Sequence, residues 1–266
     1  MLFDGQLFVL PNVAPEIDRL FSTSVIVKPK PLLIKFDDLP GKLAAEYGNY
    51  DTIFTRAMGL NKDDWLVVDP LKGELFPEVS DCSGVIISGA PAMITENFDW
   101  SLRTQSWITE VISGGVPVLG VCYGHHILAQ ALGGSVDWSE NGVECGVVQV
   151  EMTAEAAHDP LFADLPSVAE FLTHHRQVIK KPPPGAVELA GNPHSAFQAF
   201  SFGDRVWSVQ FHPELPPGLC GAMIDYDLAE GRLTEEEAAR IKSALKPTPD
   251  GALLLQGFVT VLLRSD

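Results

Sequence analysis

Short apolar runs alternate with amphipathic stretches through the first half of the chain. Buried strands are predicted at residues 31–36, 50–57, 65–69, 84–89 and 116–121. Helices, whose apolar positions recur every three or four residues, are predicted at residues 42–48, 100–113 and 124–132. Because strands that alternate with helices form right-handed βαβ units, this half predicts a mainly parallel central sheet with helices on both faces.

The second half changes character and favours antiparallel strands. These are expected at residues 147–153, 169–175, 186–191, 196–202 and 205–211. Gly203-Asp204 favours a hairpin between the last two strands. The chain then returns to helices at residues 234–245 and 251–263, and Thr234 with Glu237 forms a capping-box pattern at the first of them.

These elements predict one mixed α/β domain with a small antiparallel subsheet. The domain is expected to span residues 31–266, with C-terminal helices within residues 217–263. Residues 1–30 show little periodicity and are predicted to be an N-terminal extension.

The charge balance is strongly acidic, with 18 Lys and Arg against 35 Asp and Glu and a formal net charge of −17. This excess argues against a nucleic acid or an anionic membrane as the partner. No apolar run approaches the roughly 18 residues of a membrane span, and the N-terminus lacks the basic region of a signal peptide. We therefore expect a cytoplasmic protein that acts on a small molecule or on another protein.

Neither the cysteines nor the paired histidines have the sequence spacing that is typical of metal ligands. The four cysteines, at 82, 122, 145 and 220, contain no CxxC and favour free thiols in a reducing compartment. Histidines stand side by side at 125–126 and 174–175, and neighbours in an extended strand point to opposite faces. No metal and no cofactor are therefore expected.

Cys122 stands where a predicted strand passes into a predicted helix, in Gly120-Val121-Cys122-Tyr123-Gly124. This context is typical of a nucleophile elbow, whose sharp turn requires small residues two positions to either side. The N-terminal N–H groups of the following helix lower a thiol pKa and can bind an oxyanion. The alternative is a buried cysteine between packing glycines, and the motif alone does not name a reaction.

A thiol nucleophile needs a base, and the base needs a group that orients it. His212 ends a predicted strand, and Glu214 can accept a hydrogen bond from the second ring nitrogen. His158 and His194 lie in polar, loop-like surroundings, while His125 follows the elbow too closely to swing back. The pattern therefore favours a Cys–His–Glu triad.

Three motifs together resemble a known family. GVCYGHHILAQALGG, SVQFHPE and the earlier SGAP at 88–91 resemble the class I glutamine amidotransferases, nearest to the branch of the GMP synthetase glutaminase domain. The resemblance covers residues 31–216 in consistent order and implies their flavodoxin-like architecture. It implies that Cys122 attacks the γ-glutamyl carbonyl, His212 moves the proton and Glu214 orients His212. It also implies an oxyanion site made by backbone N–H groups around Tyr123, Gly89 and Ala90.

The chain departs from the family pattern where the substrate is expected. SGAP replaces the common SGGP, and His126 stands where the family usually has glutamine. The family's Ser-His-Gly-Asp stretch appears as Thr173-His174-His175-Arg176, which puts an arginine in place of the acidic residue. The expected substrate contacts are therefore His126, Thr173, His174, His175 and Arg176. Arg176 either binds a carboxylate-bearing ligand or points to solvent.

The resemblance leaves three functions open. Only about 50 residues follow Glu214, and no GxxxxGK[ST] phosphate loop occurs, so no ATP-dependent synthetase is predicted in this chain. The leading hypothesis is release of ammonia from L-glutamine, with a possible acceptor in an unidentified synthetase subunit. A γ-glutamyl peptidase acting on glutathione-like metabolites and a catalytically silent binding protein are the alternatives.

Overall fold

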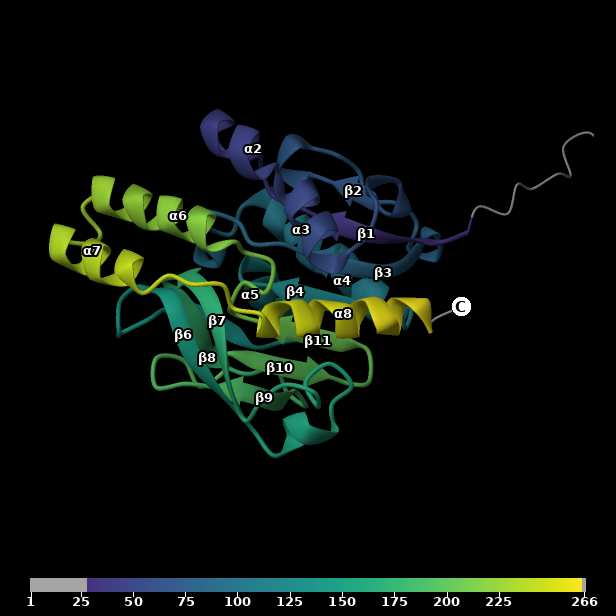
Figure 1. Ribbon diagram of the computed structural model, residues 1–266. Helices are drawn as coiled ribbons and strands as arrows, with labels where there is room; N and C mark the ends of the chain where they lie inside the picture. Colours follow the sequence, from purple (N-terminus) through teal and green to yellow (C-terminus); the bar gives the residue numbers. More distant parts are fainter. Residues whose placement is uncertain (1–27, 265–266) are drawn as a thin grey trace, which may run out of the picture.

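The computed structural model describes residues 28–264, which form a nine-stranded mixed sheet covered by helices (Figure 1). Across the sheet the strands run in the order β2-β1-β3-β4-β11-β10-β9-β6-β7. Their bounds are Lys30–Ile34 (β1), Leu66–Val68 (β2), Cys82–Ile87 (β3), Val118–Val121 (β4), Glu144–Met152 (β6), Val168–His175 (β7), Val187–Gly191 (β9), Ala199–Phe202 (β10) and Val206–Val209 (β11). Of the extension predicted at 1–30, residues 1–27 lie outside the described residues, and Lys30 already belongs to β1.

The helices cover both faces of the sheet. They are Gly41–Tyr47 (α2), Tyr50–Met58 (α3), Asp99–Ser113 (α4), Tyr123–Ala131 (α5), Pro217–Ala229 (α6), Glu235–Ser243 (α7) and Asp250–Leu263 (α8). Alternate residues of β1 show the two faces: Leu32 and Ile34 pack in the cluster of α4 and α5, whereas Leu33 packs in the cluster of α3 and α8. This alternation buries both sides of the parallel strands, which explains why they are apolar throughout.

The strand predicted at residues 50–57 is wrong, because this segment is helix α3. Its β-branched and aromatic residues favour a strand, but the buried side chains are Ile53, Phe54 and Met58. That spacing follows a 3.6-residue period and places all three on one helical face. Gly59 ends the helix in the left-handed region, at φ 68°.

The predicted antiparallel strands continue the same sheet. Strand β11 pairs in parallel with β4 and antiparallel with β10, so it joins the two halves of the chain. Strands β9, β6 and β7 follow, all in antiparallel pairs. Two further strands, Ser135–Trp138 (β5) and Gln177–Lys181 (β8), form a separate two-stranded sheet that the sequence pattern does not predict.

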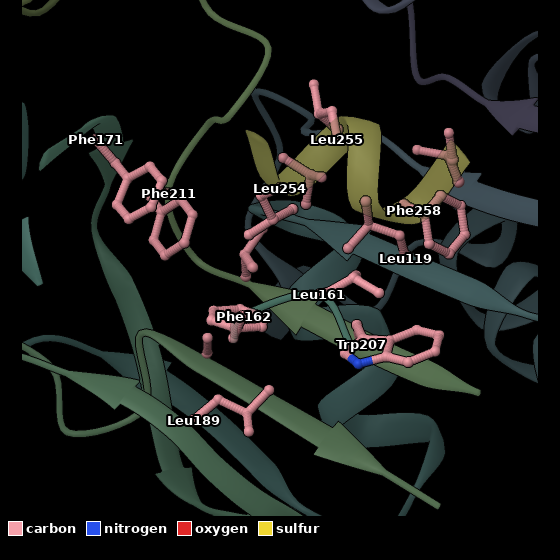
Figure 2. Close-up of a cluster of buried hydrophobic side chains, with 14 of the residues drawn as sticks. Leu119, Leu161, Phe162, Phe171, Leu189, Trp207, Phe211, Leu254, Leu255 and Phe258 are labelled. Atoms are coloured by element: carbon pink, nitrogen blue, oxygen red, sulfur yellow. The ribbon is translucent and has the colours of Figure 1, made fainter. Parts of the chain in front are cut away.

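The three C-terminal helices pack in two places. Helices α6 and α7 lie side by side against β6 and β7, while α8, in yellow, runs along the sheet near β11 (Figure 1). Leu254, Leu255 and Phe258 of α8 enter one core with Leu119 and Trp207 (Figure 2). Within residues 28–264, no helix combines the length and apolar character needed to cross a bilayer.

Candidate active site

Cys122 sits in a strained turn between β4 and α5. Its backbone has φ 53° and ψ −99°, a region that residues with a side chain rarely occupy. The flanking glycines explain how the turn closes: a β-carbon on Gly120 would lie 2.6 Å from the carbonyl oxygen of Gly124. One on Gly124 would lie 2.4 Å from the carbonyl oxygen of Ile87. The turn therefore has the backbone of a nucleophile elbow.

Backbone hydrogen bonds tie this elbow to the SGAP turn that follows β3. The N–H of Gly124 donates to the carbonyl of Ser88 at 3.1 Å. A β-carbon on Gly89 would lie 2.9 Å from Cε1 of His212 and 3.6 Å from Cβ of Cys122. The N–H of Tyr123, the first of helix α5, has no acceptor among the described residues. The thiol, the imidazole and the predicted oxyanion donors therefore converge at one place.

His212 and Glu214 form a buried pair. The Nδ1–H of His212 donates to Glu214 at 2.8 Å, and both side chains are at most 5% exposed. This bond leaves Nε2 on the side of the Cys122 thiol, and no other group among the described residues bonds it. Burial alone lowers the pKa of His212, but the charges of Glu214 and then Cys122 outweigh burial and hold that pKa well above its usual value.

The thiol opens into a cavity of about 570 Å³, within the range of roughly 300–1,000 Å³ typical of small-molecule pockets. Its lining includes the predicted residues Gly89, Ala90, Cys122, Tyr123, His126, His174, His175, Arg176 and His212. In this arrangement the thiol of Cys122 donates to the backbone oxygen of His174 at 3.8 Å. The end of β7 therefore lies directly beside the thiol.

Two of the predicted substrate-binding side chains are either buried away from the cavity or already hydrogen-bonded within the protein. Thr173 is fully buried and does not line the cavity. His175 faces acceptors with both ring nitrogens, the carbonyl of Gln177 at 3.1 Å and the carboxylate of Glu144 at 2.7 Å. Burial raises the pKa of Glu144, but the hydrogen bond and charge of His175, together with hydrogen bonds from Asn192 and Gln198, outweigh burial and lower the pKa overall. His175 therefore anchors a buried polar network and has no nitrogen left for a substrate.

The side chain of His126, in the first turn of α5 after Cys122, is uncharged. Its Nε2 bonds the side-chain oxygen of Gln210 at 2.8 Å, and the ring is 4% exposed. Burial lowers the pKa of His126 to about 4. A charged imidazole at this position is therefore excluded at neutral pH.

His174 and Arg176 meet a carboxylate that the sequence analysis does not identify. His174 donates from Nε2 to Asp227 at 2.8 Å, and Arg232 donates to the other oxygen at 3.0 Å. Arg176 lies 3.8 Å from the same carboxylate, which is fully buried. Burial raises the pKa of Asp227, but the hydrogen bond from His174 leads several contacts that lower it overall. One buried anion therefore organises three basic side chains at the cavity wall.

Tyr50 also lines the cavity, from the start of α3, although the sequence pattern does not indicate it. The wrong strand assignment hid its place at the helix N-terminus. For Asp227 a clue exists, because an acidic residue interrupts the largely apolar stretch of α6. Nothing in the sequence connects Arg232 to the cavity, because its contact depends on how α6 and the following loop pack.

One cluster near the cavity offers metal-ligand atoms. Glu144, His175 and His194 bring such atoms within 4.8 Å of one another. The carboxylate and His175 already bond each other, and His194 bonds Ser139 at 3.1 Å. A hydrogen-bond network therefore accounts for the cluster.

Comparison with known sequences finds one family across most of the described chain. The family model "Glutamine amidotransferase class-I" matches residues 66–227. γ-Glutamyl peptidase 4 of Arabidopsis thaliana is 26% identical over 205 residues, covering 75% of this chain and 81% of that protein. The glutamine-hydrolyzing GMP synthase of Aeropyrum pernix is 34% identical over 184 residues, which cover 67% of this chain but 33% of that enzyme.

Solved structures agree on the fold. A glutamine amidotransferase from Thermotoga maritima aligns with a TM-score of 0.65 and 20% identity, covering 88% of this chain and 98% of that chain. A glutamine amidotransferase from Methylobacillus flagellatus aligns with the same score over 90% of this chain. The predicted mixed α/β architecture is confirmed.

Proposed function

The chain belongs to the class-I glutamine amidotransferase family, and we propose that it hydrolyses γ-glutamyl amides, with L-glutamine as the leading substrate. Residues 31–266 would act as one catalytic domain. The observation that carries this proposal is the convergence of Cys122, on its strained turn, with the His212–Glu214 pair beside Gly89. This arrangement combines a nucleophile, a base and a group that orients the base.

In the proposed reaction, Nε2 of His212 takes the proton of the Cys122 thiol, and Sγ attacks the γ-carbonyl carbon. The N–H of Tyr123 and those of the Gly89–Ala90 turn donate to the oxygen that becomes negative. The C–N bond then breaks, and His212 returns its proton to the departing ammonia. Water, deprotonated by His212, attacks the γ-glutamyl thioester and releases glutamate and the free thiol.

The fate of the amine separates two versions of this function. If ammonia passes to a separate synthetase, the relevant comparison is a subunit of the glutamine-hydrolyzing GMP synthase of Methanopyrus kandleri, which is 31% identical over 75% of its length. A γ-glutamyl peptidase needs no such partner. Its support is that two proteins of that name, γ-glutamyl peptidases 4 and 3, are matched over 81% and 90% of their length.

We also infer that the protein works in the cytoplasm. Its four cysteines, all within the described residues, are unpaired. Free thiols persist where glutathione and thioredoxin keep the compartment reducing.

The test is ammonia release from L-glutamine by the purified chain and by Cys122→Ala. We expect release that disappears with the thiol, because the acyl-enzyme cannot form without Sγ. A panel of γ-glutamyl peptides, followed by glutamate release, distinguishes the peptidase. If neither substrate class is turned over and no covalent adduct appears at Cys122 by mass spectrometry, the enzymatic proposal is wrong and a silent binding protein replaces it.

A further inference from the structure

Arg176 and Arg232 share one carboxylate but are in different electrostatic situations. Arg232 donates to Asp227 at 3.0 Å, approaches Glu230 at 3.4 Å and lies 5.2 Å from the centre of the Tyr226 ring. Those contacts satisfy its charge within the protein. Arg176 has only the 3.8 Å ion pair with Asp227, which is too long for a hydrogen bond.

The two side-chain hydrogen bonds that Asp227 accepts come from residues other than Arg176. One carboxylate oxygen accepts from Arg232 and the other from His174. Among the described residues, no acceptor lies within hydrogen-bond distance of the Arg176 guanidinium. Its five N–H donors are therefore free to bind a ligand, while Asp227 holds the charge in place.

The guanidinium of Arg176 also lies where it can reach a substrate bound beside Cys122. Arg176 is 19% exposed and lines the same cavity as Cys122. It follows His174, whose backbone oxygen lies 3.8 Å from Sγ, by two residues. Arg176 occupies the bend between β7 and β8, and two residues of chain span at most roughly 7 Å, so its backbone lies within a substrate's length of the thiol.

We propose that Arg176, positioned by Asp227, is a specificity residue that binds a carboxylate of the γ-glutamyl substrate. The planar fork of arginine matches a carboxylate with two parallel hydrogen bonds. In a chain with a net charge of −17, an unsatisfied cation at the cavity wall also offsets the general repulsion of an anionic ligand. The carboxylate belongs either to the γ-glutamyl unit itself or to the departing amine.

This inference rests on the proposed function, so the first measurement is one of binding. Calorimetric titration of Cys122→Ser protein with γ-glutamylglycine and with L-glutamine is compared with the same titrations of Cys122→Ser/Arg176→Gln. We expect about 10- to 100-fold weaker binding of γ-glutamylglycine when the guanidinium is removed. Unchanged affinity overturns the proposal, as does a failure of the parent Cys122→Ser protein to bind either compound.

Turnover then identifies which carboxylate is bound. Arg176→Gln is assayed on γ-glutamylglycine, on γ-glutamylglycinamide and on L-glutamine. A KM increase confined to γ-glutamylglycine assigns Arg176 to the departing amine, and an equal increase on all three assigns it to the γ-glutamyl unit. No turnover by the unmodified protein, with binding still sensitive to Arg176, contradicts the proposed function but supports this inference.

Two controls separate recognition from folding. Arg176→Lys keeps the charge but loses the fork, so it should bind with intermediate affinity. Arg56→Gln removes an exposed arginine of α3 that does not line the cavity, and it should bind as the parent does. Thermal unfolding of each variant identifies any loss caused by misfolding, and equal weakening by Arg56→Gln overturns the assignment to Arg176.

Discussion

The elbow around Cys122 and the wall around Asp227 line one cavity, but they are held by different forces. The elbow depends on backbone geometry: a β-carbon on Gly120 or Gly124 would lie less than 3 Å from a backbone oxygen, and the N–H of Gly124 donates to Ser88. The wall depends on side-chain charge, where a fully buried carboxylate gathers His174, Arg176 and Arg232. We infer that the elbow sets the chemistry and the wall sets which substrate reaches it.

Gly89→Ala should have the largest effect on activity. Its new methyl would lie 2.9 Å from Cε1 of His212, so the ring must shift away from the thiol. We expect kcat on a γ-glutamyl substrate and the rate of Cys122 alkylation by iodoacetamide to fall about 100-fold, with little change in stability. Gly41→Ala, which meets nothing within 4 Å, is the matched control. Unchanged alkylation and turnover would show that Gly89 is not a close-packing requirement of the site.

Asp227→Asn, in contrast to Gly89→Ala, should mainly reduce stability. Removing a buried charge that three basic groups share is expected to cost about 3 kcal/mol in the free energy of unfolding. Urea denaturation measures that loss. Asp225→Asn is the control, because Asp225 is exposed on the same helix. Equal, small losses in both variants would mean that charge does not hold the wall.

His126→Gln should change how stability depends on pH. The pKa of about 4 in the folded protein lies below the ordinary value near 6.5, so the unfolded chain binds the proton first as the pH falls. The folded state therefore loses stability below about pH 6.5, by about 2 kcal/mol at pH 5. Glutamine does not titrate, so the variant should lose less stability between pH 7.5 and pH 5 in urea titrations. An identical loss in both proteins contradicts the assignment.

The smallest effect concerns backbone strain at Cys122, the proposed nucleophile. Cys122 adopts φ 53°, which glycine tolerates better than a residue with a β-carbon. We expect Cys122→Gly to be more stable than Cys122→Ala by about 1 kcal/mol, although neither has a thiol. Thermal and urea unfolding of the two variants measure the difference. Equal or reversed stabilities would mean that the turn stores no strain at this residue.

The sequence predicted local features more reliably than contacts between distant segments. The elbow and strand β11, which ends three residues before His212, follow from apolar runs interrupted by particular residues. The β-branched residues of α3 favour a strand and obscure the 3.6-residue spacing of Ile53, Phe54 and Met58. Strands β5 and β8 were missed because each is short and is stabilised by pairing with the other.

By itself, the sequence identified the candidate nucleophile, base and orienting acid, because each lies in a short motif next to a predicted strand end. Only the tertiary structure decided the cavity wall. In the folded protein His175 bonds Glu144, Thr173 is fully buried, and Asp227 forms an ion pair with Arg176. The physical reason is that a turn is specified by residues within a few positions of each other, whereas the wall depends on how β7 and α6 pack together.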